Sequence, residues 1–134
     1  MKFNNFSILA FCILAFACRN SDSYSKAEDA TDAGREFVRG FLDGNHKKAF
    51  HYMLKDTTNE MLFETQKEDY MRLSKEGKAE FKESSIHPVS IIPINDSVTT
   101  FRYFHSARPK DTTDLRVVKW NGEWLVDLKS VIKM

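Results

Sequence analysis

The stretch Val117-Val118-Lys119-Trp120-Asn121-Gly122-Glu123-Trp124-Leu125-Val126-Asp127 decides how this chain folds. Two runs rich in β-branched and aromatic residues flank Asn121-Gly122. An Asn-Gly pair in this setting is the strongest local signal for a hairpin with a two-residue type I′ turn. Such a turn fixes the register of the two strands. It sets Trp120 opposite Glu123, Lys119 opposite Trp124, Val118 opposite Leu125, Val117 opposite Val126 and Arg116 opposite Asp127.

The register divides the hairpin into two faces, because successive side chains of a strand point to opposite sides of the sheet. The more apolar face is expected to pack against helices, which would bury Trp124. That face carries Leu115, Val117, Lys119, Trp124, Val126 and Leu128. On the other face, Arg116 and Asp127 are expected to form a modest cross-strand ion pair.

The residues before this hairpin extend the sheet. From Ser84 the apolar residues recur with period two, which predicts strands over 86–94 and 98–106 in addition to 115–120 and 123–129. If the loop Asn95-Asp96-Ser97 has three residues, a second register follows. It pairs Ile94 with Val98, Ile91 with Phe101, Val89 with Tyr103 and His87 with His105.

The first half of the chain has helical spacing instead. Apolar residues recur three and four positions apart and predict a first helix with Thr31 or Asp32 near its start: Ala30, Ala33, Phe37, Val38, Phe41 and Leu42. Gly44 is expected to end that helix and Asn45 to cap a second one. A charged region over 59–83 predicts one helix and a short further helix capped by Ser74. Helices followed by strands predict an α+β fold, with N-terminal helices packed on one face of an antiparallel sheet.

The N-terminus has the pattern of a bacterial lipoprotein leader. Lys2 precedes an apolar stretch over 6–17 that is too short to span a membrane, and Ala15 and Ala17 stand before Cys18. We therefore expect residues 1–17 to be a signal peptide, Cys18 to be acylated, 18–26 to be a polar tether and 27–134 to be one domain. The alternative is an ordinary secretory leader cut near Ala17. Leu14 lies four residues before Cys18, one further than in the usual lipoprotein signal.

Localisation and partners follow from these features. A lipid anchor predicts a bacterial cell-envelope protein, held to the membrane by its acyl groups. Arg19 does not resemble the Asp-based signal for inner-membrane retention, so the outer membrane is favoured. The whole chain has 20 basic and 19 acidic residues and a net charge of +1. That balance argues against a nucleic-acid binder, which needs a basic excess on one face.

A resemblance to a known superfamily covers residues 27–129. The order of segments resembles that of small bacterial lipoproteins in the nuclear transport factor 2-like superfamily. It consists of an Ala-rich first helix, a Gly-Asn break, a second helix ending in Tyr52-Met53-Leu54 and a sheet ending in Val117–Asp127. The resemblance implies a curved antiparallel sheet wrapped around helices in a cone that often holds a pocket. A cystatin-like arrangement is the structural alternative. Enzymes of the superfamily include ketosteroid isomerases and dehydratases, but none of their motifs matches here.

The candidate site consists of aromatic and histidine side chains that the cone would bring together. The possible pocket residues are Phe41, Tyr52, Phe101, Tyr103, His105 and Trp124, and filling of a core is the alternative role for these aromatic residues. His87 and His105 would face each other, but no clear third ligand completes a metal site. His46 and His51 are expected at the surface. No catalytic residue, metal or cofactor is predicted.

The sequence thus favours a lipid-anchored envelope module that binds a small apolar ligand, or that docks an envelope protein through the sheet face around Trp120. The alternative is an isomerase- or hydratase-like enzyme. Such an enzyme would need a desolvated acid or base inside the cone.

Overall fold

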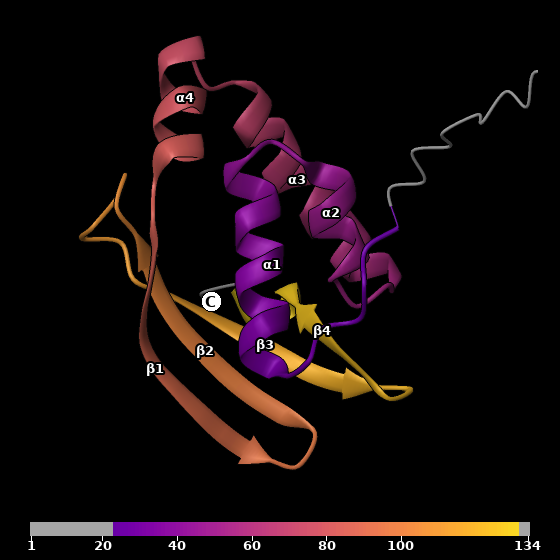
Figure 1. Ribbon diagram of the computed structural model, residues 1–134. Coiled ribbons are helices and arrows are strands. Elements are labelled where there is room, and N and C mark those ends of the chain that lie inside the picture. Colours follow the sequence, from indigo (N-terminus) through magenta and orange to yellow (C-terminus); the bar gives the residue numbers. More distant parts are fainter. Residues whose placement is uncertain (1–22, 132–134) are drawn as a thin grey trace, which may run out of the picture.

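The computed structural model describes residues 23–131 and confirms an α+β fold (Figure 1). The predicted leader, Cys18 and the first part of the tether lie outside the described residues. Four helices precede four strands and a short 3-10 helix. The elements are α1 (Ala30–Leu42), α2 (His46–His51), α3 (Thr57–Met71), α4 (Lys75–Glu83), β1 (Ile86–Asn95), β2 (Val98–His105), β3 (Thr113–Trp120), β4 (Glu123–Asp127) and η1 (Leu128–Val131).

The strands form one antiparallel meander in the order β1-β2-β3-β4. The predicted β3–β4 register is confirmed from Trp120 opposite Glu123 through to Arg116 opposite Asp127. The turn between them has φ of 49° at Asn121 and 77° at Gly122. Positive φ at both central residues is the requirement of a type I′ turn, so the Asn-Gly pair sets this hairpin.

The predicted β1–β2 register is wrong except at Ile91, which does pair with Phe101. The loop has two residues instead of three, and Asn95 pairs with Val98. The side chain of Asn95 accepts a hydrogen bond from the backbone N–H of Ser97 at 2.9 Å, which tightens the turn.

Two irregularities in β1 shift the rest of that pairing. They lie between Pro88 and Ser90 and between Pro93 and Asn95. Proline cannot donate a ladder hydrogen bond, so it is tolerated at edge strands and bulges. In consequence His87 lies opposite Phe104 and stacks on its ring at 4.8 Å, and it does not face His105.

Each helix begins with a side-chain cap that its sequence supplies. Asp29 caps α1, two or three residues before the predicted Thr31 or Asp32, and Asp56 caps α3. Asn45 and Ser74 cap α2 and α4 as predicted. Gly44 has a φ of 69°, which ends α1 in the left-handed conformation as expected.

The core lies between the helices and one face of the sheet. Figure 1 shows α1 lying across the sheet, and α1 contacts all four strands. The predicted inner face of the last hairpin is confirmed by complete burial of Val117 and Val126. Phe37 and Val38 pack on it from α1. None of the helices over 23–131 is both long and apolar enough to cross a membrane.

Three details of the last hairpin differ from expectation. Trp124 is only half-buried, and the ammonium of Lys119 lies 5.7 Å from its ring centroid. Strand β4 ends at Asp127, so Leu128 is buried from the 3-10 helix instead. The carboxylate of Asp127 is 3.2 Å from the ammonium of Lys129. Lys129, and not the facing Arg116, is therefore its ion-pair partner.

Part of the predicted tether contacts the domain. Tyr24 exchanges a hydrogen bond with the Asn45 side chain and packs on the His51 ring at 5.6 Å. The Tyr52 hydroxyl donates to the carbonyl of Ser25 at 2.9 Å, and Lys26 lies 3.6 Å from Glu123. The segment therefore lies along α2 before α1 begins (Figure 1).

Candidate functional site

The structure brings three of the six predicted pocket residues together. Phe41, Tyr103 and His105 line one cavity of about 280 Å³. Phe101 is fully buried in the core, and Tyr52 is buried with its hydroxyl bonded to Ser25. Trp124 packs beside Lys119, away from the cavity. For these last three, the alternative role as core or packing residues is the one observed.

The cavity lies between α1, α3, α4, β2 and the loop that follows β2. Phe37 and Phe41 are four residues apart on α1, so they lie on one helix face, and their ring centroids are 5.2 Å apart. Leu73 lines the cavity from the turn between α3 and α4, Phe81 lines it from near the end of α4, and Tyr103 lines it from the sheet. The lining is therefore mainly apolar.

Four polar side chains lie among these apolar walls: Gln66, Asp69, His105 and Arg108. Asp69 and its neighbour Arg72 are joined by a hydrogen-bonded ion pair of 3.3 Å at the surface. The guanidinium carbon of Arg108 lies 5.4 Å from the Phe81 ring centroid. This small set of polar groups in an apolar cavity is typical of a ligand site.

His105 is the most unusual of these groups. Its Nδ1 atom is buried without a hydrogen-bond partner, and its ring meets the edge of Phe81 at 5.1 Å. Burial, and then the positive charge of Arg108, lower the pKa of His105 below its ordinary value. The imidazole is therefore neutral at neutral pH, and one of its nitrogens still lacks a partner.

Tyr103 supplies the floor of the cavity without supplying a charge. Its ring stacks on Phe101 with centroids 5.5 Å apart. Burial raises the pKa of Tyr103 to about 12, so the phenol stays protonated across the physiological range.

Sequence reasoning missed the role of His46. Contrary to expectation, its ring is not at the surface without contacts. The ring centroid of His46 lies 5.3 Å from that of Phe41 and 5.0 Å from that of Tyr70. Its Nε2 atom is buried without a partner, and burial lowers its pKa. His46 thus supports the cavity wall from behind Phe41 and Tyr70. Its position directly after the Asn45 cap, where the chain turns back on α1, was the available signal.

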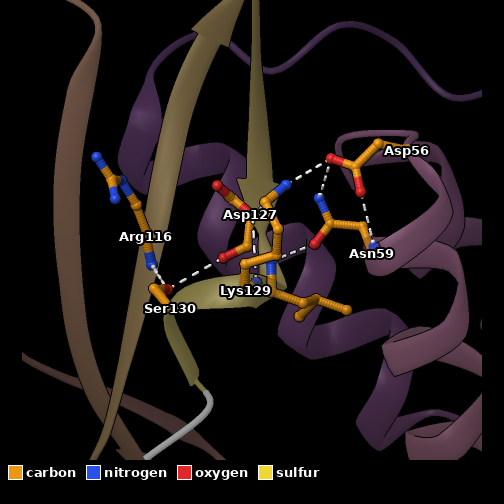
Figure 2. A network of polar contacts seen from close by, with 7 residues as sticks. Asp56, Asn59, Arg116, Asp127, Lys129 and Ser130 are labelled. Carbon is orange, nitrogen blue, oxygen red and sulfur yellow. Dashed lines mark hydrogen bonds and ion pairs between the residues drawn. The ribbon is translucent and has the colours of Figure 1, made fainter.

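A polar network holds the C-terminal end of the sheet to the start of α3 (Figure 2). Asn59 is fully buried, accepts a hydrogen bond from the backbone N–H of Leu128 at 2.8 Å and donates one to Asp56 at 3.1 Å. The ammonium of Lys129 is 2.5 Å from Asp56. All these groups have partners, so we assign the network a structural role.

Over residues 23–131, no group of three or more His, Cys, Asp or Glu side chains is arranged to hold a metal ion. The pairing of His87 with His105, on which a zinc site would have depended, is wrong because of the shifted register of β1.

Comparison with family models, with curated proteins and with solved structures finds no match to this chain. The site is therefore interpreted from its own geometry.

Proposed function

We propose that this protein is a lipid-anchored binding module of the bacterial cell envelope that holds a small apolar ligand in the cavity beneath α1. The cavity itself is the observation that carries the proposal. Its volume of about 280 Å³ is close to the lower end of the usual range for ligand pockets, about 300 Å³. The occupant is therefore a small molecule and not a long acyl chain.

The walls suit such a ligand energetically. Aromatic rings of Phe37, Phe41, Phe81 and Tyr103 present faces and edges to the cavity. Removing apolar ligand surface from water stabilises the complex by about 25 cal/mol per Å². Aromatic contacts of good geometry add about 0.5–1.5 kcal/mol each.

The location rests on the leader and on Cys18. With Cys18 acylated, the six residue steps to Tyr24 span at most about 20 Å. The domain would then stay close to the membrane, with the outer membrane favoured. Changing Cys18 to Ser is expected to leave the protein unprocessed or soluble. Full retention of that variant in the membrane fraction after an alkaline wash would contradict the anchor.

Membership of the nuclear transport factor 2-like superfamily is part of this proposal. Helices that precede a curved antiparallel sheet, and a cavity between them, support it. The last hairpin, which carries the most specific part of the resemblance, forms with the expected register.

A pair of matched variants tests ligand binding. Leu73→Trp enlarges a half-buried side chain of the cavity wall and should abolish stabilisation of the protein by small aromatic compounds in a thermal-shift screen. Met71→Trp is the control, because Met71 is 59% exposed on the same helix end and does not line the cavity. Equal ligand stabilisation of both variants would contradict binding in this cavity.

An acid–base enzyme is the second candidate, and His105 is the observation that favours it. A neutral histidine with an unpartnered nitrogen in a cavity could accept a proton from a substrate. An isomerase of this kind also needs a group that stabilises developing negative charge, and Arg108 is the cationic group of the described residues that lines the same cavity. Substrate turnover that His105→Gln abolishes without loss of folding would establish the enzyme and overturn the non-catalytic proposal.

Docking of an envelope protein is the other form of the binding proposal. Trp120 and Ile94 are each 60% exposed, and the β1–β2 hairpin extends beyond the helices (Figure 1). If docking is the function, Trp120→Ala should remove a co-purifying protein while leaving the thermal-shift response of the cavity unchanged.

A further inference from the structure

The mouth of the cavity carries an asymmetric arrangement of charge. Arg108 is the only lysine or arginine on its wall among the described residues. No carboxylate of the described residues lies within ion-pair distance of its guanidinium, which packs instead over the Phe81 ring. Asp69, the acidic group of the same cavity, is already paired with Arg72. The positive charge is therefore the one without an ion-pair partner, although Glu80 and Asp111 line an adjoining cleft together with Arg108.

The backbone holds Arg108 beside His105. The N–H of Arg108 donates to the carbonyl of His105 at 2.9 Å, and the N–H of Asp111 donates to the carbonyl of Arg108 at 3.1 Å. These bonds make a turn directly after β2. They place the Arg108 guanidinium and the His105 imidazole on the same wall of the cavity.

Other charged groups near His105 are engaged elsewhere. Arg39 donates to the carbonyl of Ser84 at 2.8 Å and pairs with Asp43 at 2.8 Å. Asp111 and Glu80 act on His105 only through longer-range electrostatic attraction. Arg108 and His105 therefore both keep free hydrogen-bonding capacity at the cavity.

We propose that the ligand is a small apolar carboxylic acid, whose hydrocarbon or aromatic body lies among Phe41, Phe81 and Tyr103 and whose carboxylate is bound by Arg108 and His105. This inference rests on the proposed function, because it names the ligand class of the same cavity. A planar guanidinium binds a carboxylate through two parallel hydrogen bonds. His105 lines the same wall, so a proton on its imidazole would give the third donor.

The test uses three probes with one common body and different headgroups: hydrocinnamic acid, phenylpropanol and phenylpropylamine. Their affinities for the full chain are measured by titration calorimetry in the same nonionic detergent. We expect the acid to bind about 10- to 100-fold more tightly than the alcohol, as is typical when a hydrogen-bonded charge is added. The amine should bind weakest.

Two variants identify the group responsible. Arg108→Gln should reduce acid binding to the level of the alcohol and leave alcohol binding unchanged. Lys110→Gln is the matched control, since it removes the same charge from the same loop without touching this cavity, and it should leave all three affinities unchanged.

The outcomes separate the inference from the proposed function. Equal affinity for acid and alcohol, tighter binding of the amine, or an equal loss in both variants would overturn the carboxylate assignment while leaving a ligand cavity. Absence of binding by all three probes would overturn both the carboxylate assignment and the small-ligand proposal.

Discussion

Replacing Asn59 by Ala should destabilise this fold more than any other single change on the polar side of α3. Asn59 is fully buried, and its amide makes two hydrogen bonds, to the Leu128 N–H at 2.8 Å and to Asp56 at 3.1 Å. The variant leaves the N–H of Leu128, itself 1% exposed, without an acceptor. An unsatisfied buried donor costs about 1–3 kcal/mol, and loss of the bond to a charged partner adds about 1 kcal/mol or more.

The free energy of unfolding should therefore fall by about 2–4 kcal/mol. For a domain of this size that corresponds to a decrease in Tm of roughly 10 °C. Urea unfolding followed by tryptophan fluorescence measures the change, because Trp124 of the last hairpin packs against the core. Thr58→Ala, one residue earlier on the exposed side of the helix, is the control and should change stability by less than about 0.5 kcal/mol.

A second variant separates hydrogen bonding from packing. Asn59→Asp keeps an acceptor for Leu128 but places a second carboxylate beside Asp56. It should be strongly destabilising at neutral pH and should regain stability relative to the parent as the pH falls, because protonation removes the buried charge. A loss below about 1 kcal/mol for Asn59→Ala, or no pH dependence for Asn59→Asp, would refute the structural role of this network.

Three further predictions concern the sheet, α1 and the cavity. Trp124→Ala should lower the free energy of unfolding by about 2–3 kcal/mol, which is less than the roughly 3–5 kcal/mol of a fully buried aromatic residue. Trp120→Ala should lower it by under about 0.5 kcal/mol, because Trp120 is 60% exposed. Equal losses for the two variants in urea unfolding would contradict the assignment of Trp124 to the inner face of the sheet and Trp120 to the outer face. Gly34→Ala should lower the free energy of unfolding by about 1–3 kcal/mol, because the added Cβ would lie 2.7 Å from the ring of the fully buried Phe101. An unchanged Tm would contradict this, because it would mean that the Phe101 ring moves aside without loss of packing. Burial lowers the pKa of His105, so as the pH falls the unfolded chain takes up a proton on this histidine before the folded chain does. The free energy of unfolding should therefore decrease as the pH drops below the ordinary value of 6.5. His105→Phe should reduce this pH dependence of stability, and an unchanged dependence would contradict the burial of His105.

The elements whose formation is local were predictable from the sequence. Asn121-Gly122 determines its turn by backbone conformation alone, so the register from Trp120 to Asp127 followed without knowledge of the rest of the molecule. Gly44 and Asn45 likewise act within one helix end. The spacing of Phe37 and Val38 was sufficient to identify the buried face of α1.

The register of β1 was not predictable in the same way. Counting back from the loop assumes an uninterrupted ladder, and Pro88 and Pro93 each lie at an irregularity in that ladder. Their position in an edge strand could have warned of bulges, but the number of residues accommodated there depends on how β2 pairs with β3.

The candidate site was predictable only in part for a similar reason. Phe41, Tyr103 and His105 were identified as aromatic and polar groups of one cone, but Tyr52 and Phe101 are separated from the cavity by the packing of the N-terminal segment and of α1. Arg108 was missed because it lies in a polar loop, where a lone arginine has no sequence pattern.

Asn59 was missed because a polar residue in a charged helix is expected to face water. The available signal was Asp56-Thr57-Thr58-Asn59, in which an N-cap residue is followed three positions later by an amide side chain. Only the tertiary contact with η1 explains why that amide is buried.

The most direct test of the central claim is an NMR titration of the full chain with uncharged phenylpropanol, which separates ligand binding in the cavity from docking on the sheet. The account predicts the largest chemical-shift changes at Phe41, Tyr103 and His105, saturating together with one affinity, while Trp120 stays unchanged. Changes centred on Trp120 and Ile94, or no change at the cavity residues at the highest probe concentration, would contradict it.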